Sequence, residues 1–596
     1  MGVINLPLIL NSGGSGSACF RHFVLQPPVH WSGIAYMQHI ILIQPPVEDF
    51  YFTFKRSVPY GLASIAAGLI QRGFSVEIVD ALAVKKSVII PYPREMEFLT
   101  AFYGEPDVSQ FSLFHHYRHY GYSFEHIGNI VRDRAPFMVG ISSLFTPYAE
   151  TALNTARMVK KFYPHCPVVL GGHHPTLFPR EVMDCDSVDF VLAGEGEVSM
   201  PLLAETWDKI SGSTPPGKEI KELSLDQEAQ LAKVPGITFR TNSGGLHMSP
   251  PAWMTDLAAQ PMPQLDLIHQ KFYQRKGRGS AVVVAGRGCP MNCTYCSLGA
   301  SSTHARFRLR PVEQVLAEIQ HNVDHHDMGF LDFEDENLTL NRKWCMALLE
   351  GICEMAGEGD VELRAMNGLY PPSLDDALVK AMKRAGFKTL NLSLGSTLAT
   401  QLKAFRRPDV RASHENALVL AEKYGLEAVS YLIAGAPGQD AMQSVQDLLF
   451  LASRRTLVGL SIYYPAPGSV DYGICQERGL LPGHFSLMRS TALPIEDTTT
   501  RLASVTLLRL ARVLNFMKFL KDQGMQLPRA LALKKKTVLD PSHRVDSSLK
   551  LLQGFLNDGV IRGITPDGRV FEHSMDMTLS RAFVAGLSRM EIRGTV

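Results

Sequence analysis

Three of the nine cysteines in this 596-residue chain lie within eight residues, at Cys289, Cys293 and Cys296. The spacing is C-x3-C-x2-C, and it follows an apolar run that predicts a β-strand. Three thiolates on one loop can hold three irons of a [4Fe–4S] cluster and leave the fourth iron open to a substrate or cofactor. A structural zinc site is the alternative, but it requires four ligands, and His304 is the nearest candidate for the fourth.

The composition is that of a globular protein with balanced charge. Hydrophobic residues make up 45% and charged residues 20%, and 59 Lys and Arg against 58 Asp and Glu give a net charge of +1. This balance gives no electrostatic reason to expect nucleic-acid binding. No apolar run is long enough to span a membrane, and the chain does not open with a secretory signal. The cysteines are too few for a disulfide framework, so we expect a protein of the reducing cytoplasm.

Apolar runs alternate with helical periods between residues 37 and 200, which is typical of a parallel sheet with helices on both faces. Strands are expected at 39–44, 75–80, 137–142, 167–171 and 188–193. We therefore predict a Rossmann-like α/β domain of the flavodoxin type over residues 37–200. A long insertion, 81–136, separates the second and third strands, and its His115-His116-x-x-His119 either binds metal or belongs to an aromatic lid.

Small and polar residues follow three of these strands. Because ligands of such sheets bind at the carboxyl ends of the strands, these residues are candidates for a binding site. They are Ser142, Ser143, Gly171, Gly172, His173, His174, Glu195 and Gly196.

A second strand–helix alternation follows a predicted linker, 201–275, which holds a small hairpin near Ile237–Arg240. The six strands expected here lie at 281–286, 328–334, 360–366, 387–394, 426–433 and 457–464. Six consecutive strand–helix units predict a partial (β/α)6 barrel over 276–475, with a flat doubly wound sheet as the alternative. Residues 476–596 are expected to be mainly helical. Residues 1–36 are expected to be a disordered arm or an extension before a true start at Met37.

The cysteine segment resembles the motif C-x3-C-x-aromatic-C of the radical S-adenosylmethionine (SAM) superfamily, with Tyr295 at the aromatic position. The resemblance extends to the cobalamin-binding branch of that superfamily and covers roughly residues 39–475. The further segments that carry it are Gln44-Pro45-Pro46, Pro59–Ala63, Gly171–Glu197, Phe307–Pro311 followed by Glu313, Phe333–Asn337 and Leu432–Gly438. Residues 37–200 are then similar to a cobalamin-binding domain and residues 276–475 to a radical SAM barrel.

The resemblance implies a [4Fe–4S] cluster on the three cysteines, with SAM bound to the open iron. It places Glu334, Asp335 and Asn337 at the mouth of the barrel, where Asp335 or Asn337 binds the methionine ammonium or the ribose; a solvated acidic loop is the alternative. Ile433 and Gly435 match the strand that contacts adenine. Where many relatives have Gly-Ile-Glu-Ser, this chain has Ser393-Leu394-Gly395-Ser396, so Ser393 or Ser396 is the candidate for the ribose contact.

For cobalamin, the Asp-x-His-x-x-Gly motif of many cobalamin enzymes is absent after the first strand. We therefore expect cobalamin to bind base-off, without a histidine ligand from that loop. Ser142 and Ser143 would line the slot for the nucleotide tail, and Gly171 and Gly172 would let the cofactor approach the backbone. His173 and His174 are interpreted as hydrogen-bonding residues of the loop rather than cobalt ligands.

The function implied by the resemblance is transfer of a methyl group from SAM, through methylcobalamin, to an unactivated carbon of a small molecule. An electron donor such as flavodoxin or ferredoxin is the expected partner. The alternatives are a non-methylating enzyme of the same branch, which forms or rearranges rings, and a cobalamin-binding regulatory protein. A regulatory protein would not need the three cysteines.

Overall fold

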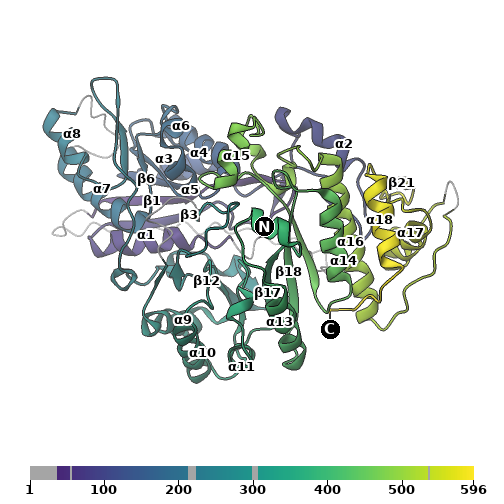
Figure 1. Cartoon of the computed structure of the whole chain (residues 1–596). Coiled ribbons are helices and arrows are strands. Elements are labelled where there is room, and N and C mark those ends of the chain that lie inside the picture. The colour runs from purple at the N-terminus through teal and green to yellow at the C-terminus, as the bar shows by residue number, and fades with distance from the viewer. Residues whose placement is uncertain (1–36, 54–56, 213–222, 299–306, 534–536, 596) are drawn as a thin grey trace, which may run out of the picture.

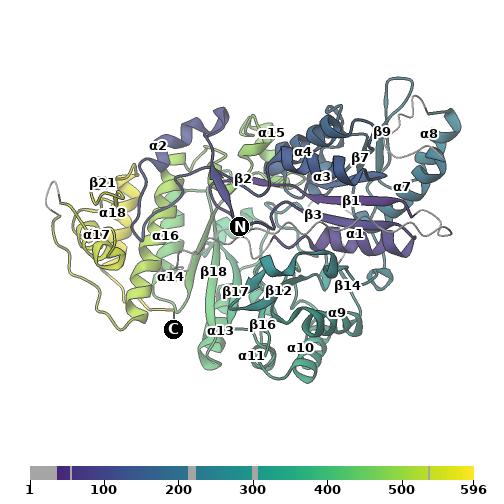
Figure 2. The ribbon, with the colours of Figure 1, turned by 180° about the vertical axis from the view of Figure 1, so that it is seen from behind.

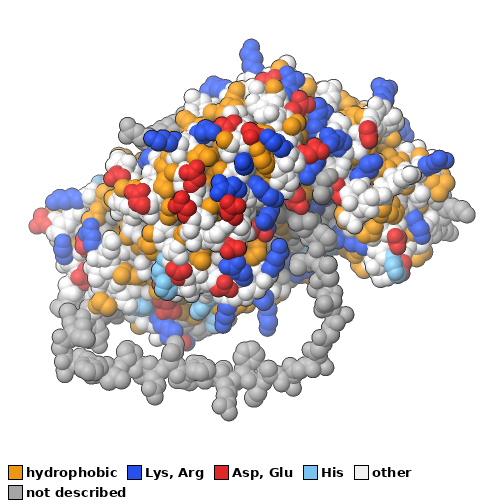
Figure 3. All heavy atoms as spheres, turned by 90° about the horizontal axis from the view of Figure 1, so that it is seen from below, with side chains coloured by type: hydrophobic (Ala, Val, Ile, Leu, Met, Phe, Trp, Pro, Cys, Tyr) orange, Lys and Arg blue, Asp and Glu red, His pale blue; other side chains and the backbone are white. Residues whose placement is uncertain are grey.

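The computed structural model describes residues 37–53, 57–212, 223–298, 307–533 and 537–595. The expectations for residues 1–36 and for His304 lie outside the described residues. Figure 1 shows two α/β halves in succession, followed by a helical end. Among the described helices, none combines the length and apolar character that a membrane crossing requires. On the face that Figure 3 shows, side chains of both charges are interspersed.

The first half is built on a seven-stranded sheet with the order β10-β9-β8-β7-β6-β1-β3. Its parallel strands match the five that the sequence predicts, and their order corresponds to the flavodoxin-like 2-1-3-4-5. These strands are β1 (His39–Gln44), β3 (Ser75–Asp80), β6 (Met138–Ser142), β7 (Val168–Gly171) and β8 (Phe190–Leu192).

Helices cover both faces of this sheet because the side chains of β1 alternate between them. Ile40 and Leu42 lie in the same apolar cluster as α1 (Tyr60–Gln71) and α7 (Gly196–Ser211). Ile41 and Ile43 lie in the cluster formed with α3 (Phe124–Arg134) and α4 (Ala149–Phe162). Gly73 ends the first helix: it adopts φ +85°, and its amide donates to the carbonyl of Ile70.

Part of the expected linker belongs to this first sheet. The predicted hairpin consists of β9 (Ile237–Arg240) and β10 (Leu246–Met248), and β9 pairs antiparallel with β8. Ile237 and Phe239 are buried. A hairpin that buries these side chains needs a neighbouring sheet and its covering helices, so the sheet extends beyond the expected boundary at residue 200.

The second half contains six parallel strands that neighbour one another in chain order. β12, β15 and β16 pair in one sheet, with the short antiparallel β11 (Gln274–Arg275) at its edge, and β17, β18 and β19 pair in another. Parallel bridges from Leu363 to Phe387 and from Leu369 to Leu392 join the two sheets. Within the described residues, β12 and β19 do not pair, so no closed barrel is present. The strands are β12 (Arg278–Val283), β15 (Met328–Phe333), β16 (Glu362–Arg364), β17 (Thr389–Gly395), β18 (Glu427–Ala434) and β19 (Leu457–Ile462).

The strands of the second half alternate with helices, as the sequence predicts. These helices are α9 (Val312–His326), α10 (Arg342–Ala356), α11 (Asp376–Ala385), α13 (Arg411–Lys423) and α14 (Ala441–Ala452). The end of the chain is mainly helical, with α16 (Arg501–Asp522), α17 (Arg544–Asp558) and α18 (Met577–Leu587). Between the last two helices lies a hairpin of β20 (Arg562–Ile564) and β21 (Val570–Glu572).

The first part of the insertion, residues 94–117, packs on this C-terminal region, whereas its last part, α3, covers the first sheet. Met96, Leu99 and Tyr103, from the 3-10 turn Arg94–Leu99 and from α2 (Thr100–Tyr103), are buried in the same cluster as α16 and α17. Both views of the ribbon show α2 beside the C-terminal helices (Figures 1 and 2). His119, on β5 (Arg118–Tyr120), contacts Glu48 at 3.0 Å and the Tyr122 carbonyl at 2.8 Å. The histidines of the insertion therefore form no ligand group among the described residues.

Candidate functional site

The cysteine loop begins at the carboxyl end of β12, where β13 (Gly286–Arg287) pairs with β14 (Arg308–Leu309). Cys293 is buried, and Cys289 and Cys296 are partly exposed. Thr294 anchors the loop, because its amide donates to the Phe405 carbonyl at 3.1 Å and its hydroxyl donates to Asp471 at 3.1 Å. The loop is thus tied to the segments that follow β17 and β19.

The three thiols share one environment. Burial, together with the neighbouring Cys293 and Cys289, raises the pKa of Cys296 to about 11. The amide of Asn337 donates to the sulfur of Cys289 at 3.6 Å. A bound cation would reverse the pKa effect, since a coordinating thiol is deprotonated. Three soft sulfur ligands, one of which accepts a hydrogen bond from Asn337, fit an iron–sulfur cluster.

The acidic segment after β15 lies directly beside this loop. The carboxylate of Asp335 accepts from the amide of Ala285 at 3.1 Å, and that of Glu336 accepts from Gly288 at 3.0 Å. Asp335 and Asn337 are only 4% and 6% exposed, so the segment is not a solvated loop. Burial raises the pKa of Asp335 to about 8.

Two oxygens of this segment remain available. Among the described residues, Oδ1 of Asp335 and Oδ1 of Asn337 have no hydrogen-bond partner although both are buried. Buried acceptors are normally satisfied, so each calls for a donor from a bound molecule or water. An ammonium group beside the thiols meets that need, which fits the expected position of SAM. Glu334 directly follows β15, and its backbone amide donates to the carbonyl of Val283, the last residue of β12 before the cysteine loop.

The two serines of β17 and its end already have partners in the protein. The hydroxyl of Ser396 is fully buried and donates to Asp447 at 2.9 Å. Ser393 accepts from the guanidinium of Arg407 at 2.9 Å. The structure therefore assigns Ser396 to the hydrogen-bond network of Asp447, and it leaves Ser393 beside the site.

Arg407 is a residue that the sequence reasoning missed. Its guanidinium donates to the hydroxyl of Tyr295 at 2.8 Å, and the nearby thiol of Cys293 contributes to the elevated pKa of Arg407. A Cβ on Gly395, which has φ +81°, would lie 3.4 Å from Cδ of Arg407. The only sequence signal for Arg407 is the glycine at position 395, where many relatives have an acid. The side chain of Arg407 passes over Gly395.

Ile433 and Gly435 lie where β18 ends. The carbonyl of Ile433 accepts from the side chain of Gln439 at 2.9 Å. Gly435 has φ +79°, a conformation that favours glycine, so the backbone turns sharply after the strand. Ile433 is partly exposed and packs in a cluster with Tyr295 and Phe405, which places this strand end near the aromatic residue of the cysteine motif.

At the other sheet, Ser142 and Ser143 lie at the end of β6 and Gly171 at the end of β7. Gly172 has φ +120°, and a Cβ there would lie 2.6 Å from the carbonyl oxygen of Ser143. The protein's own backbone therefore requires a glycine at this position. The hydroxyl of Ser143 is buried and has no partner among the described residues.

His173 and His174 begin the short helix α5 (His173–Leu177) and differ in their surroundings. His173 is exposed, whereas His174 is 2% exposed and packs against the rings of Phe178 and Phe485. Burial lowers the pKa of His174 to about 4, so its ring is neutral at neutral pH. Its Nδ1 is buried without a partner among the described residues. Together with Ser143 it offers polar atoms at the sheet edge, which fits the tail of cobalamin.

Glu195 and Gly196 have roles in the protein itself. The carboxylate of Glu195 accepts from Arg308 at 2.9 and 3.0 Å and lies 3.3 Å from Arg287. Arg287 also pairs with Glu197. A Cβ on Gly196 would lie 2.9 Å from Ile65, so the glycine lets α7 approach α1. Glu195 and Gly196, which the sequence predicts to contact a cofactor, lie where the two halves meet.

The carboxyl ends of the two sets of strands face each other. Phe485, which follows β19 and α15 (Val470–Glu477), packs on His174 with ring centroids 4.9 Å apart. A Cβ on Gly468 would lie 3.3 Å from Leu177. Figure 1 shows α15 beside α5. The edge with Ser143 and the loop with the thiols thus belong to one region between the halves.

Comparison with known proteins decides the family. Residues 110–204 match the model of the B12 binding domain, and residues 283–451 match that of the radical SAM superfamily. The protein is a cobalamin-binding radical SAM protein. The two matched models name the two cofactor systems, cobalamin and SAM, that the sequence predicts.

Several relatives of this cobalamin-binding radical SAM protein span most of it. An uncharacterized methyltransferase of Pyrococcus horikoshii is 26% identical over 441 residues, which cover 72% of this chain and 81% of the relative. An anaerobic magnesium-protoporphyrin IX monomethyl ester cyclase of Cereibacter sphaeroides is 24% identical over 353 residues, which cover 58% of this chain and 54% of the cyclase. The structure of the radical SAM methyltransferase TsrM from Kitasatospora setae, with cobalamin and a [4Fe–4S] cluster bound, superposes with a TM-score of 0.52 at 15% identity, covering 74% of this chain and 75% of TsrM. The similarity to TsrM, at 15% identity, concerns the fold alone.

Proposed function

We propose that this enzyme is a C-methyltransferase that moves a methyl group from SAM, through cobalamin, to an unactivated carbon of a small molecule or biosynthetic intermediate. The observation that carries the proposal is that the thiol loop and the polar edge of the first sheet lie on facing strand ends of one chain. The methyltransferase relative, which covers 72% of this chain, supports the same reaction class. We further propose that the six strands from β12 to β19 form a partial barrel around the SAM site.

When bound, the cluster supplies the electron that cleaves SAM to a carbon radical, and cobalamin supplies the methyl carrier. We assign Cys289, Cys293 and Cys296 as the cluster ligands. Asn337 donates to Cys289, and such donors tune the potential of a cluster. Oδ1 of Asp335 and Oδ1 of Asn337 accept hydrogen bonds from the ammonium of SAM. An external donor such as flavodoxin or ferredoxin supplies the electron, in a reducing cytoplasm.

Arg407 is a positioning residue in this proposal. Through Tyr295 and Ser393 it joins the cysteine loop to β17, so it fixes the loop against the strand that borders the SAM site. Gln439 holds the carbonyl of Ile433, which orients the strand end that would contact adenine. Ser143 and neutral His174 hydrogen-bond the tail of cobalamin, while the phenylalanines around His174 exclude water from that edge.

The test is anaerobic reconstitution with iron, sulfide, cobalamin and SAM. Replacing the three motif cysteines together by Ala should abolish both the cluster absorption and the formation of 5′-deoxyadenosine, because no thiol ligand remains. Cobalamin should still bind, since Ser143 and His174 belong to a different sheet. Cys353→Ala is the matched control, because this thiol lies on α10 and is not part of the motif.

Two outcomes would overturn the proposal. A cluster retained by the triple variant would exclude the assigned ligands. Release of 5′-deoxyadenosine with a product that gains a ring but no methyl group would favour the chemistry of the cyclase relative instead. The cyclase matches 58% of this chain and the methyltransferase 72%, so methyl transfer is the expected result.

A further inference from the structure

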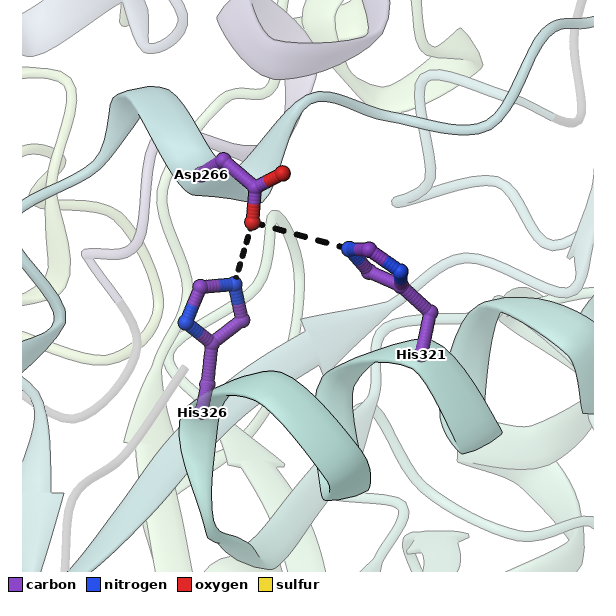
Figure 4. Close-up of side chains that lie close together, drawn as sticks. All are labelled: Asp266, His321 and His326. Atoms are coloured by element: carbon purple, nitrogen blue, oxygen red, sulfur yellow. Dashed lines mark hydrogen bonds and ion pairs between the residues drawn. The ribbon is translucent and has the colours of Figure 1, made fainter.

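Three side chains that could bind a metal ion converge at a second place, away from the cysteines. Asp266 lies on a 3-10 turn (Leu265–Leu267), and His321 and His326 lie on the last turns of α9. Their ligating atoms all lie within 4.8 Å of one another. Figure 4 shows the two imidazoles pointing toward the same carboxylate oxygen from the helix below it.

The distances suit a shared cation. Nε2 of His321 lies 3.5 Å from Oδ1 of Asp266, and Nε2 of His326 lies 2.6 Å from the same oxygen. Two ligands about 2.0–2.1 Å from a tetrahedral zinc ion are separated by about 3.3 Å. His321 therefore already has the required separation from Asp266. His326, which makes a direct hydrogen bond, has to move by roughly 0.7 Å for a metal to enter.

The surroundings also favour a cation. The side chains of His326, His321 and Asp266 are 15%, 32% and 55% exposed, so the site is open to water on the side of the carboxylate. The carboxyl end of a helix carries a partial negative charge, and both histidines are on the last turns of α9. Two imidazoles and one carboxylate leave a coordination position for water, which is a ligand set that zinc accepts.

We propose that Asp266, His321 and His326 form a site for a divalent transition metal, with water as the fourth ligand and zinc as the preferred ion. β15 begins at Met328, two residues after His326, and it runs parallel to β12. The site therefore lies at the amino ends of strands whose carboxyl ends carry the cysteine loop. A metal there joins the segment between the two halves to α9 and takes no part in the radical chemistry.

The test uses holoenzyme with its iron–sulfur cluster in place. The protein is equilibrated with Zn²⁺, dialysed into metal-free buffer and analysed for zinc by mass spectrometry. We expect about one zinc ion per chain, a rise in melting temperature on zinc addition, and, with Co²⁺ in place of Zn²⁺, the visible absorption of a nitrogen- and oxygen-ligated ion. Asp266→Asn and His326→Ala should each weaken zinc binding at least tenfold, because even a change to a partner that only orients a metal ligand costs about 10–100-fold in affinity.

Two variants on the same helix serve as controls. Asp324→Asn removes an exposed acid that bonds Gln320, and His325→Ala removes a ring that stacks on His321 without belonging to the ligand group. Both should retain zinc. Zinc should also persist when the three motif cysteines are replaced by Ala, which separates this site from the cysteine loop and from the proposed methyl transfer. Zinc lost on dialysis, zinc retained unchanged in Asp266→Asn, or loss in His325→Ala equal to that in His326→Ala would each overturn the assignment.

Discussion

At the scale of single residues, burial fixes the protonation of His174 at the edge of the first sheet. Its ring is 2% exposed between two phenylalanines, and burial lowers its pKa to about 4. A neutral imidazole keeps one nitrogen as donor and one as acceptor, which is the state a hydrogen-bonding residue needs. A cationic ring in this apolar contact would lack a partner.

The lowered pKa of His174 predicts acid lability. The group titrates near 6.5 in the unfolded chain and near 4 in the folded protein, so the unfolded chain binds more protons between these values. The free energy of unfolding should therefore fall as the pH is lowered from about 6.5 toward 4, by about 2 kcal/mol at pH 5 from this group alone. Urea denaturation at pH 7 and pH 5 measures this loss.

His174→Leu should remove that share of the pH dependence, because the leucine does not titrate. His165→Leu, at an exposed position, is the control and should keep the pH dependence of the unchanged protein. An equal loss of stability at pH 5 in the protein and in His174→Leu would show that His174 is not the group responsible.

The residues of the candidate site were predictable to different degrees. The three cysteines can be predicted as a ligand set from sequence because the chemistry of a cluster demands three thiols on one loop. Ser396 follows β17, whereas its partner Asp447 lies on α14, far along the chain, so the sequence does not reveal that this hydroxyl is already bonded. The sequence analysis does not identify Arg407. Spacing along the chain predicts which residues of one loop can act as ligands together. Which side chains from later parts of the chain reach that loop depends on tertiary packing, which the spacing does not show.

At the scale of elements, several of the motifs that carry the family resemblance lie where the two halves meet. Arg310 bonds both Glu318 at 2.6 Å and the hydroxyl of Tyr60 at 3.2 Å, and all three residues are buried. Arg287, two residues before the first motif cysteine, pairs with Glu195 and Glu197 at the start of α7. These ion pairs set the orientation of the cysteine loop toward the first sheet.

Glu195→Ala should test this coupling. The change leaves Arg308 buried with its carboxylate partner removed and takes one of two carboxylate partners from Arg287. Loss of one member of a buried ion pair costs about 3–5 kcal/mol, so we expect a clear drop in the free energy of unfolding. We also expect faster loss of the reconstituted cluster, because the loop that holds it is no longer tied to α7. Cluster absorption during anaerobic incubation measures this rate.

Glu150→Ala is the matched control on the same half of the molecule. Glu150 pairs with Arg157 on the surface of α4, where both side chains are exposed. Such pairs contribute about 0–1 kcal/mol, so this variant should resemble the unchanged protein. An equal cluster lifetime in Glu195→Ala and Glu150→Ala would show that the ion pairs of Glu195 do not stabilise the cysteine loop.

The positions of most helices and strands were predictable from the sequence. The strands or surfaces against which the hairpin and the insertion pack were not. The five strands of the first sheet and the six of the second half lie close to the expected positions because apolar runs and helical periods are local signals. The hairpin at 237–248 was also expected, but its pairing with β8 depends on an edge that the sequence does not reveal. The same holds for the insertion, whose aromatic residues signalled burial without showing which surface buries them.

At the scale of the whole molecule, the insertion connects the beginning of the chain to its end. Phe111 packs on Phe516 with ring centroids 5.7 Å apart, and the hydroxyl of Tyr103 donates to the carbonyl of Thr491. Arg489 pairs with Asp49 at 3.0 Å, and both side chains are buried. A fragment that ends near residue 200 would expose these surfaces, so we expect the cobalamin-binding half to depend on the C-terminal region for its stability.

The centre of this connection is a chain of hydrogen bonds through His573. Arg509 donates to Nδ1 of His573 at 2.9 Å, and Nε2 of the same ring lies 3.0 Å from Asp107. A guanidinium can only donate, so Nδ1 is the acceptor and Nε2 carries the proton that Asp107 accepts. Asp107 also accepts from the amides of Ser109 and Ile564 at 2.8 and 3.0 Å. One buried carboxylate thus serves both the insertion and the C-terminal hairpin.

Asp107→Ala should therefore destabilise the whole molecule, by about 3 kcal/mol, because several buried donors lose their acceptor at once. Glu105→Ala is the control within the same segment, since Glu105 pairs with Arg569 across the same boundary but with both side chains exposed. That pair is expected to contribute less than about 1 kcal/mol. Urea denaturation followed by fluorescence and by cobalamin release measures both variants. If Asp107→Ala raised amide hydrogen exchange only in the C-terminal helices and left cobalamin release unchanged, the insertion would not couple the two ends of the chain.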